Sequence, residues 1–389
     1  MLPRQAATMM GQLALAFPVI ALTGPRQSGK TTLARQAFPD KPYFSLEDPE
    51  VRQRILADPR SFFAQHPQGA VLDEAQRAPE LFSYLQGVVD ERGCMGQFVL
   101  TGSQQFGLTQ AITQTLAGRV GLVHLLPLAW PELQASTKVP RGLNQALLRG
   151  GYPALFDPRR QVPDAAPWLS AYTSTYIERD VRQLLGVVNL TLFRRFVLMC
   201  AARSGQLLNL SALASDCGIS HTTARAWLSV LEASYVVHLL PPYHRNFGKR
   251  LVKMPKLYFL DTGLLCHLLR VDSAQTLATH AMRGAIFETW VVSETLKHRF
   301  NRGQDAELFF WRDNHGTEVD LLYEHGGKLH AVEVKSGATF TSDWLHACEL
   351  WLKYAGTAAA APLIVYGGNE SFSLRGMQVM AWHRMGLAA

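Results

Sequence analysis

The chain has 389 residues, of which 48% are hydrophobic and 18% charged, and its formal net charge at pH 7 is +7. At about 150 residues per domain, this length predicts two or three domains with buried cores, and the composition excludes a disordered chain. No apolar run reaches the roughly 18 residues of a membrane-spanning helix, because the best candidate, Leu13–Leu22, is short and contains Pro18.

Cysteine usage and the N-terminus indicate the compartment. The five cysteines are scattered, and no two of them form a C-x-x-C pair, which argues against a disulfide framework and a zinc site. The N-terminus has no cleavage pattern typical of a signal peptide. We therefore expect a cytoplasmic protein with no membrane partner.

Positive charge is concentrated in the middle of the chain. Residues 165–276 contain 12 Lys and Arg against 6 Asp and Glu. A local basic excess indicates a polyanionic partner, and a solubilising surface would explain it equally well.

The first block, to about residue 160, alternates short apolar runs with helical patterns, which predicts βαβ units and a parallel sheet. The expected strands are 17–23, 42–46, 70–72 and 97–101, and the expected helices are 31–37 and 80–91. Prolines near residue 164 indicate a domain boundary.

A phosphate-binding loop follows the first strand. The segment Gly24-Pro25-Arg26-Gln27-Ser28-Gly29-Lys30-Thr31 fits G-x-x-x-x-G-K-[ST] in full, and Thr32 continues into the predicted helix. Glycines let backbone N–H groups surround phosphates, and the helix N-terminus adds partial positive charge. Lys30 would reach the β- and γ-phosphates and Thr31 would ligate Mg²⁺. The motif predicts binding of ATP with Mg²⁺.

Two carboxylates end the strand at 70–72. Asp73 would hold the magnesium ion, and Glu74 would orient or deprotonate the attacking water. Asp-Glu after a strand is also a common helix start, but downstream of a phosphate loop it predicts hydrolysis.

Two further residues are candidates for the catalytic machinery. The strand expected between the two motif strands ends at Ser103, with Thr101 just before it. One of these two residues would sense the γ-phosphate. The alternative is that they are simply a polar strand terminus. Arg119 would be an arginine finger supplied across a subunit interface, and a surface arginine or a structural ion pair is the alternative.

The middle block predicts a helix-turn-helix followed by a basic hairpin. Ser211 is a candidate N-cap for a helix over 212–216, and Ser220 for a helix that continues through residue 234. Strands at 235–240 and 256–260 would flank the hairpin, as in a winged helix. The candidate phosphate contacts are Arg225, Arg245, Lys249, Arg250, Lys253 and Lys256. Docking of a protein partner is the alternative use of such a module.

The last block reads as a helix over 283–297, strands at 307–312, 317–324 and 328–335, a helix near 343–354 and a strand at 363–366. Asp320 lies in the second strand, while Glu333 and Lys335 share one face of the third. With Glu288 they would form a nuclease-like metal site. A Glu–Lys pair on an exposed strand is the alternative.

Together these motifs resemble, over nearly the full length, a broad group of bacterial and archaeal AAA-like ATPases that end in a domain of unknown function. The matching stretches are Gly24–Thr32, Val71–Gln76, Leu100–Ser103, Leu116–Arg119, Gly150–Pro153, Ile177–Val181, Tyr258–Leu264, Glu318–Asp320 and Val332–Lys335. The resemblance implies an ATPase, a winged helix and an end domain of the PD-(D/E)xK nuclease type. The Pro-Asp of that nuclease type is Val319-Asp320 here.

The sequence therefore predicts an α/β fold with three domains: a P-loop ATPase domain over 1–164, a helical winged-helix domain over 165–276 and a nuclease-like domain over 277–389. The function we expect is an ATP-driven motor or switch that acts on DNA as a homo-oligomer, such as a ring or hexamer. One alternative is a regulatory switch with a protein partner and an inactive end domain. The other is an ATP-coupled, metal-dependent nuclease.

Overall fold

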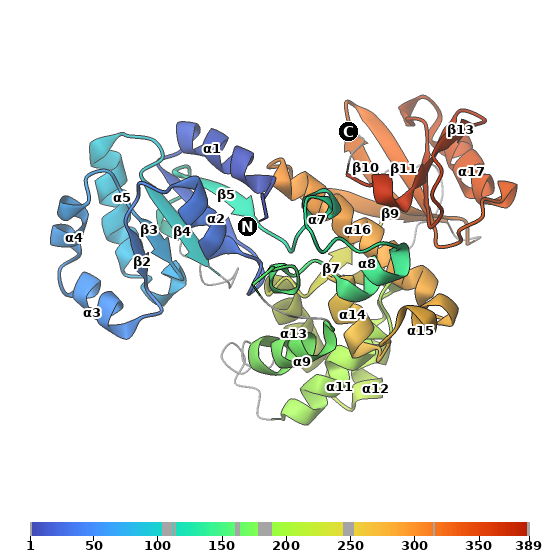
Figure 1. Cartoon of the computed structure of the whole chain (residues 1–389), viewed down its shortest axis with the longest axis horizontal. Helices are drawn as coiled ribbons and strands as arrows, with labels where there is room; N and C mark the ends of the chain where they lie inside the picture. Colours follow the sequence, from blue (N-terminus) through green and yellow to red (C-terminus); the bar gives the residue numbers. More distant parts are fainter. Residues whose placement is uncertain are drawn as a thin grey trace. The chain divides into compact units, whose positions relative to one another are not determined.

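The structure, a computed structural model, describes residues 2–102, 112, 114–159, 164–177, 189–243, 253–313 and 316–386. The chain forms two compact units (Figure 1). Unit 1 comprises Met1–Leu128, Ala233–Tyr235 and Lys297–Asp305, and unit 2 comprises the three segments Ala129–Glu232, Val236–Leu296 and Ala306–Ala389. The domain boundaries at 164/165 and 276/277 stay predictions.

Unit 1 is built on a five-stranded parallel sheet in the order β2-β3-β4-β1-β5. Its strands are β1 (Val19–Thr23), β2 (Tyr43–Ser45), β3 (Val71–Asp73), β4 (Phe98–Gly102) and β5 (Val120–His124). Its helices are α1 (Ala6–Ala16), α2 (Lys30–Ala37), α3 (Pro49–Ala57), α4 (Pro59–Gln65) and α5 (Leu81–Arg92). The predicted parallel sheet is confirmed, and β4 lies between the two motif strands β3 and β1 as expected.

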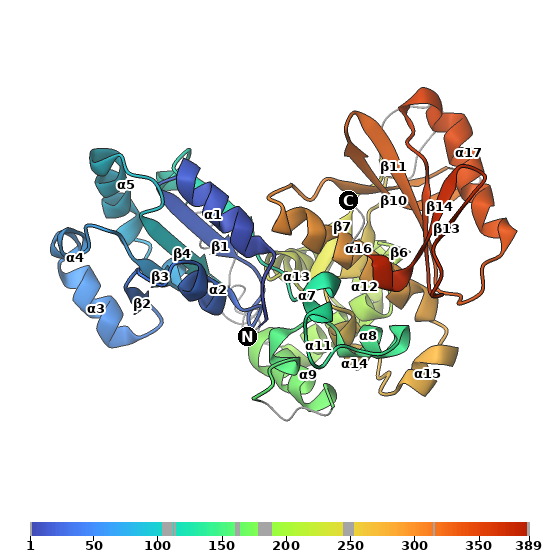
Figure 2. The ribbon, with the colours of Figure 1, turned by 45° about the horizontal axis from the view of Figure 1, so that its top comes forward.

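The sheet is covered on both faces, and its central strands β1, β3 and β4 are buried along their whole length. On one face, side chains of α1 and α2 pack on Ile20, Leu22 and Val99. On the other, side chains of α4 and α5 pack on Ala21 and Leu100. Figure 2 shows α1 lying along β1. The carboxyl ends of β1, β3 and β4 thus meet at one edge, where parallel α/β sheets bind ligands.

The first half of unit 2 is mostly helical and carries a small antiparallel sheet in the order β6-β8-β7. Its strands are β6 (Gln206–Leu207), β7 (Val237–Leu240) and β8 (Lys256–Phe259). The helices are α7 (Trp130–Gln134), α8 (Leu143–Arg149), α9 (Ala166–Tyr172), α11 (Leu190–Ala201), α12 (Leu210–Cys217), α13 (His221–Ala233), α14 (Thr262–Leu268) and α15 (Ala274–Thr279).

The second half of unit 2 contains a six-stranded mixed sheet in the order β13-β14-β12-β11-β10-β9. The strands are β9 (Leu308–Arg312), β10 (Glu318–His325), β11 (Lys328–Lys335), β12 (Leu363–Tyr366), β13 (Phe372–Leu374) and β14 (Met377–Ala381). Helix α16 (Arg283–Asn301) precedes the sheet, and α17 (Leu345–Ala355) packs on it through Leu345, Cys348 and Trp351. The helices and strands expected from residue 283 to 366 are all present.

Among the described helices, none combines the length and the apolar character needed to cross a membrane.

Candidate functional site

The turn between β1 and α2 has a backbone that only glycine can adopt at its first position. Gly24 has a φ of 149°, and a Cβ atom there would lie 2.1 Å from the carbonyl oxygen of Leu125. Gly29 has a φ of 95° and is the N-cap of α2. A glycine turn that leads into a helix N-terminus presents backbone N–H groups to an anion. The predicted phosphate loop therefore has the backbone that its motif requires.

The side chains of the loop fit a phosphate ligand. Lys30 is only 6% exposed, and its Nζ donates to the carbonyl oxygens of Gly24 (3.0 Å) and Pro25 (2.8 Å). The Oγ of Ser28 is buried and has no hydrogen-bond partner among the described residues. Arg4, which is not part of the motif, connects the loop to the segment after β5. Its guanidinium donates to the carbonyl oxygens of Ser28 (2.6 Å) and Leu126 (2.7 Å).

Asp73 is the centre of a set of hydroxyl groups at the end of β3. Its carboxylate accepts hydrogen bonds from Thr31 Oγ1, 3.0 Å from each oxygen, from the Tyr43 hydroxyl (2.7 Å) and from Thr101 Oγ1. Hard oxygen donors of this kind are what Mg²⁺ prefers. The predicted metal ligands Thr31 and Asp73 are thus adjacent, and this donor set fits the ion.

Of the two sensor candidates, Thr101 lies at this site. Ser103 lies outside the described residues. Thr101 is fully buried and its Oγ1 also accepts from the backbone N–H of Glu74 (3.3 Å). Burial and the Asp73 carboxylate raise the pKa of Tyr43, so this phenol stays protonated and donating.

Glu74 has an unusual backbone for a non-glycine residue. Its φ and ψ are 54° and 45°, in the left-handed region, which costs free energy and is enriched at functional sites. Its Oε2 accepts from Gln76 Nε2 at 2.5 Å. Gln76 therefore holds the carboxylate of the predicted water-activating residue.

Arg119 pairs with an acidic side chain of its own chain. Its Nε lies 2.5 Å from Asp90 Oδ1, and its second guanidinium contact to Asp90 is 2.8 Å. This is the ion pair that the sequence left open as the alternative. The role of Arg119 as an arginine finger stays a prediction.

The residue before the phosphate loop belongs to a buried hydrogen-bond triad. Thr23 Oγ1 lies 2.9 Å from the Tyr235 hydroxyl and 2.9 Å from His124 Nδ1, which are themselves 2.8 Å apart. Tyr235 has a φ of 56°, and burial lowers the pKa of His124. The Tyr235 hydroxyl therefore bonds directly to the residue that precedes the phosphate loop.

Helices α12 and α13 occupy the two helical segments predicted here, with one correction at the first cap. The turn contains Gly218 with a φ of 70°, and Ser220 Oγ caps α13 by accepting from Thr223 N–H (3.0 Å), as expected. Asn209, not Ser211, is the N-cap of α12, because its Oδ1 accepts from Ala212 N–H at 3.0 Å. The helix begins at Leu210, so Ser211 is already inside its first turn.

The predicted nucleic-acid contacts fall into three groups. Arg225 on α13 and Lys253 before β8 are exposed. Arg245, Lys249 and Arg250 lie outside the described residues. Lys256 was predicted on the same surface, and this is wrong. Its side chain is 4% exposed and pairs with Glu288 at 2.8 Å.

The predicted nuclease-like residues do come together in unit 2. Glu333 Oε1 and Lys335 Nζ are 2.5 Å apart, and Asp320 Oδ2 accepts from Val334 N–H at 2.8 Å. Carboxylate oxygens of Glu288, Glu318 and Asp320 all lie within 4.8 Å of one another. Burial and the neighbouring Glu288 and Glu333 raise the pKa of Asp320 well above its ordinary value.

Comparison with known proteins identifies the family. The AAA domain matches residues 16–134, and two domains of unknown function, DUF8612 and DUF4143, match residues 140–275 and 283–385. The uncharacterized protein Rv2008c of Mycobacterium tuberculosis is 34% identical over 374 residues, covering 95% of this chain and 81% of that protein. The chain belongs to the family of this mycobacterial protein. The uncharacterized protein Mb2031c of Mycobacterium bovis matches to the same extent.

Two solved structures are similar at low identity. The Walker-type ATPase PABY2304 of Pyrococcus abyssi has a TM-score of 0.42 at 14% identity, and the match covers 68% of this chain and 95% of that one. The RuvB Holliday junction branch migration motor of Thermotoga maritima has a TM-score of 0.29 at 16% identity, covering 62% and 90%. These scores are too low to establish a shared overall architecture.

The sequence predicts no role in a site for three of these side chains. Tyr43 and Gln76 contact Asp73 and Glu74, and Glu318 joins the carboxylates of unit 2. A signal existed for Glu318, because it lies two residues before Asp320 on one strand and so shares its face. Tyr43 is far from Asp73 in the chain, and only the pairing of β2 with β3 brings them together.

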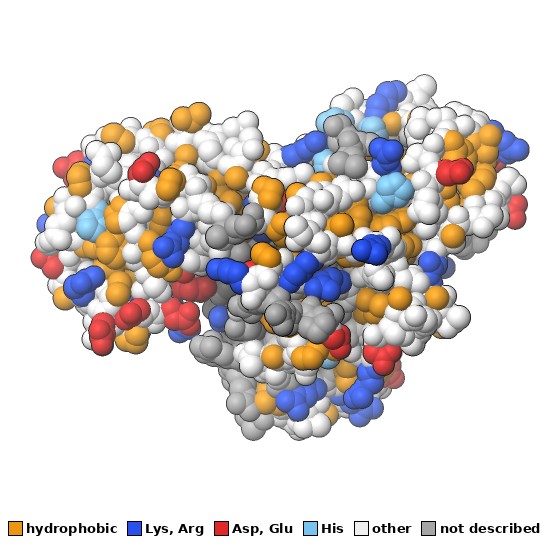
Figure 3. Space-filling view, in the orientation of Figure 1, with side chains coloured by type: hydrophobic (Ala, Val, Ile, Leu, Met, Phe, Trp, Pro, Cys, Tyr) orange, Lys and Arg blue, Asp and Glu red, His pale blue; other side chains and the backbone are white. Residues whose placement is uncertain are grey.

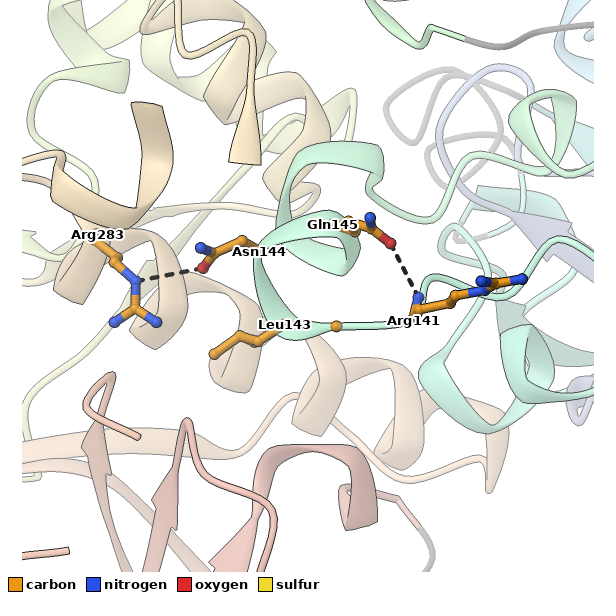
Figure 4. A pocket seen from close by; sticks show the side chains of 6 residues that line it. Arg141, Leu143, Asn144, Gln145 and Arg283 are labelled. Atoms are coloured by element: carbon orange, nitrogen blue, oxygen red, sulfur yellow. Dashed lines mark hydrogen bonds between the residues drawn. The ribbon is translucent and has the colours of Figure 1, made fainter. Parts of the chain in front are cut away.

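A pocket of about 370 Å³ lies beside α8, lined by Arg141, Gly142, Leu143, Asn144, Gln145 and Arg283 (Figure 4). Arg283 Nε donates to Asn144 Oδ1 (3.4 Å), while Gln145 Oε1 accepts from the backbone N–H of Arg141 (3.2 Å). The two guanidinium groups lie at opposite ends of the view and do not converge, so they do not form a joint anion site.

Proposed function

We propose that this protein binds ATP with Mg²⁺ and hydrolyses it. The observation that carries the proposal is the direct bonding of Thr31 to Asp73 beside the glycine turn, with Glu74 as the next residue. The match of the AAA domain to residues 16–134 supports it.

Each residue of the site has a distinct role in this proposal. Lys30 exchanges its two backbone carbonyl partners for phosphate oxygens, which are stronger acceptors because they are charged. Thr31 and Asp73 would hold Mg²⁺, which supplies charge neutralisation at the phosphates. Glu74, held by Gln76, orients the water and accepts its proton. Thr101 links the Asp73 carboxylate to the backbone N–H of Glu74.

Two substitutions test the ATPase. Lys30→Ala is expected to abolish nucleotide binding, measured with a fluorescent ATP analogue. Glu74→Gln is expected to bind the analogue normally and to lose turnover by about 100-fold or more, because general-base catalysis contributes that much. Glu80→Gln, an exposed carboxylate on the same unit, is the control and should keep wild-type turnover. Equal turnover in Glu74→Gln would remove Glu74 from the mechanism.

We further propose that the protein acts on DNA as an oligomeric motor or switch. Helices α12 and α13 with the antiparallel pair β7–β8 support a winged-helix module. His221, Thr222 and Arg225 lie on the exposed face of α13, while Ala224, Trp227 and Leu228 are buried. A helix with this division of faces is suited to the major groove.

Stimulation of turnover distinguishes this proposal from its rival. If DNA is the partner, single-stranded, duplex or branched DNA should raise the ATPase rate and bind at low salt. The rival is a switch that docks a protein, and one observation favours it: Lys256 is buried, which removes a charge from the expected basic surface. Absence of both DNA affinity and stimulation would decide for the rival.

The oligomer has its own test. The proposal places Arg119 of one subunit at the ATP of the next, which requires the Asp90 pair to open. Sizing with and without ATP should show assembly, and Arg119→Ala should lower turnover while ATP binding is kept. A monomer at all ATP concentrations would refute the ring.

A further inference from the structure

The carboxylate cluster of unit 2 surrounds a lysine side chain. Lys256 enters from β8, while Glu318 and Asp320 come from β10 and Glu288 comes from α16. Lys256 Nζ lies 2.8 Å from Glu288 Oε1, forms a close ion pair with Glu318 and lies 3.9 Å from Asp320 Oδ1. The ammonium group thus contacts the same three carboxylates whose oxygens converge.

The side chain of Lys256 is buried within the carboxylate cluster. Its side chain is 4% exposed, and its Nζ lies 5.5 Å above the centre of the Phe310 ring. The Tyr258 hydroxyl donates to Glu288, the carboxylate oxygen that also contacts Lys256. Burial alone would lower the pKa of Lys256, but Glu288, Asp320 and Glu318 together raise it. The side chain is therefore charged in the folded protein.

The positive and negative charges of this cluster nearly balance without any added ion. Lys256 and Arg312 pair with Glu318, Lys256 also pairs with Glu288, and Lys335 pairs with Glu333. Three cations thus face the four carboxylates of Glu288, Glu318, Asp320 and Glu333. A divalent ion at the same oxygens would sit within a few ångströms of the Lys256 ammonium in a buried setting, where like charges repel most strongly.

We propose that Lys256 is the resident cation of this cluster and stands in the place of a divalent metal ion. The nuclease fold that the sequence resembles uses such carboxylates to hold a metal, and the residues present here do not fit that use. The end domain then lacks metal-dependent cleavage, and the carboxylates instead fasten β8 to α16 and β10. This inference does not depend on the ATPase proposed for unit 1.

Binding of Mn²⁺ in the absence of nucleotide tests the proposal, read by electron paramagnetic resonance of the full chain. Wild type and Asp320→Asn should give the same titration, because no metal occupies the cluster. Lys256→Met should gain a Mn²⁺ site, tighter than any in wild type by about tenfold or more, a usual scale for neighbouring groups at metal sites. The double variant Lys256→Met/Asp320→Asn should lose it. Lys353→Met, an exposed lysine on α17, should match wild type.

Two results would overturn the proposal. One is a Mn²⁺ site in wild type that Asp320→Asn removes. The other is a folded Lys256→Met protein, judged by circular dichroism, that gains no site. If Lys256→Met does not fold, the comparison of wild type with Asp320→Asn still decides, because it needs no change at the lysine.

Discussion

Gly24 shows how strictly one residue can be fixed at the nucleotide site. Its φ of 149° is unfavourable for any side chain, and a Cβ atom would meet the backbone of Leu125, which cannot rotate away. We expect Gly24→Ala to abolish nucleotide binding and to lower the free energy of unfolding by about 1–3 kcal/mol, the usual cost of a strained backbone. Binding of a fluorescent ATP analogue and thermal unfolding measure the two effects.

Gly87 provides the matched control for this substitution. It lies on the exposed side of α5, and a Cβ atom there meets nothing within 4 Å. Gly87→Ala should therefore raise the free energy of unfolding by about 0.5–1 kcal/mol through helix propensity and leave nucleotide binding unchanged. Normal nucleotide binding by Gly24→Ala would show that the turn is not the cradle described above.

At the scale of a single helix, the start of α12 depends on one amide side chain. Asn209 Oδ1 satisfies the backbone N–H of Ala212, which has no earlier helical carbonyl to bond. Asn209→Ala should cost about 1 kcal/mol in the free energy of unfolding and speed hydrogen exchange at Ala212. Ser211→Ala, two residues later and exposed, should change that free energy by less than about 0.5 kcal/mol. A larger loss in the free energy of unfolding from Ser211→Ala than from Asn209→Ala would show that Ser211 is the N-cap.

His238 on strand β7 makes the free energy of unfolding depend on pH. Burial lowers the pKa of His238 to about 4, from an ordinary value of 6.5. Below pH 6.5 His238 is protonated in the unfolded chain and stays neutral in the folded chain. The contribution of this residue to the free energy of unfolding is therefore fully present above pH 6.5 and is lost as the pH falls toward 4. The loss approaches about 3 kcal/mol at most, at about 1.4 kcal/mol per pKa unit.

Difference measurements isolate this histidine from the other titrating groups. We expect His238→Leu to unfold at a higher temperature than wild type at pH 5 and to reduce the pH dependence between pH 6.5 and 4. His221→Leu, at an exposed position of α13, should leave that dependence as it is. Parallel curves for wild type and His238→Leu would show that His238 takes up its proton in the folded state.

Across the whole molecule, the sequence predicts what is contiguous and misses what the fold brings together. Gly24 to Thr31 lie on one stretch between a strand and a helix, so both their fold and their chemistry could be read directly. The Thr23–His124–Tyr235 triad joins three distant segments, and no local pattern marks it.

The error at Lys256 has the same origin. A lysine that follows a basic, proline-containing segment has the pattern of an exposed hairpin, and only its tertiary contacts show that it is buried among carboxylates. The local alternation of β8 cannot reveal this, because its four residues are all buried and the strand has no polar face. The basic excess of residues 165–276 therefore overstates the charge that is available to a partner.

The remaining exposed cations make a quantitative test of the DNA proposal. On the face drawn in Figure 3, Lys and Arg side chains are interspersed with uncharged and acidic ones. Each phosphate contact contributes about 0.9 to the slope of log K against log salt. Arg225→Ala and Lys253→Ala should each reduce that slope by about 1 and weaken binding to all sequences alike. Arg60→Ala, an exposed residue of α4, is the control and should leave the slope unchanged. If all three variants keep the wild-type slope, DNA does not contact unit 2 through α13 or the start of β8, and the protein-docking alternative gains the stronger support.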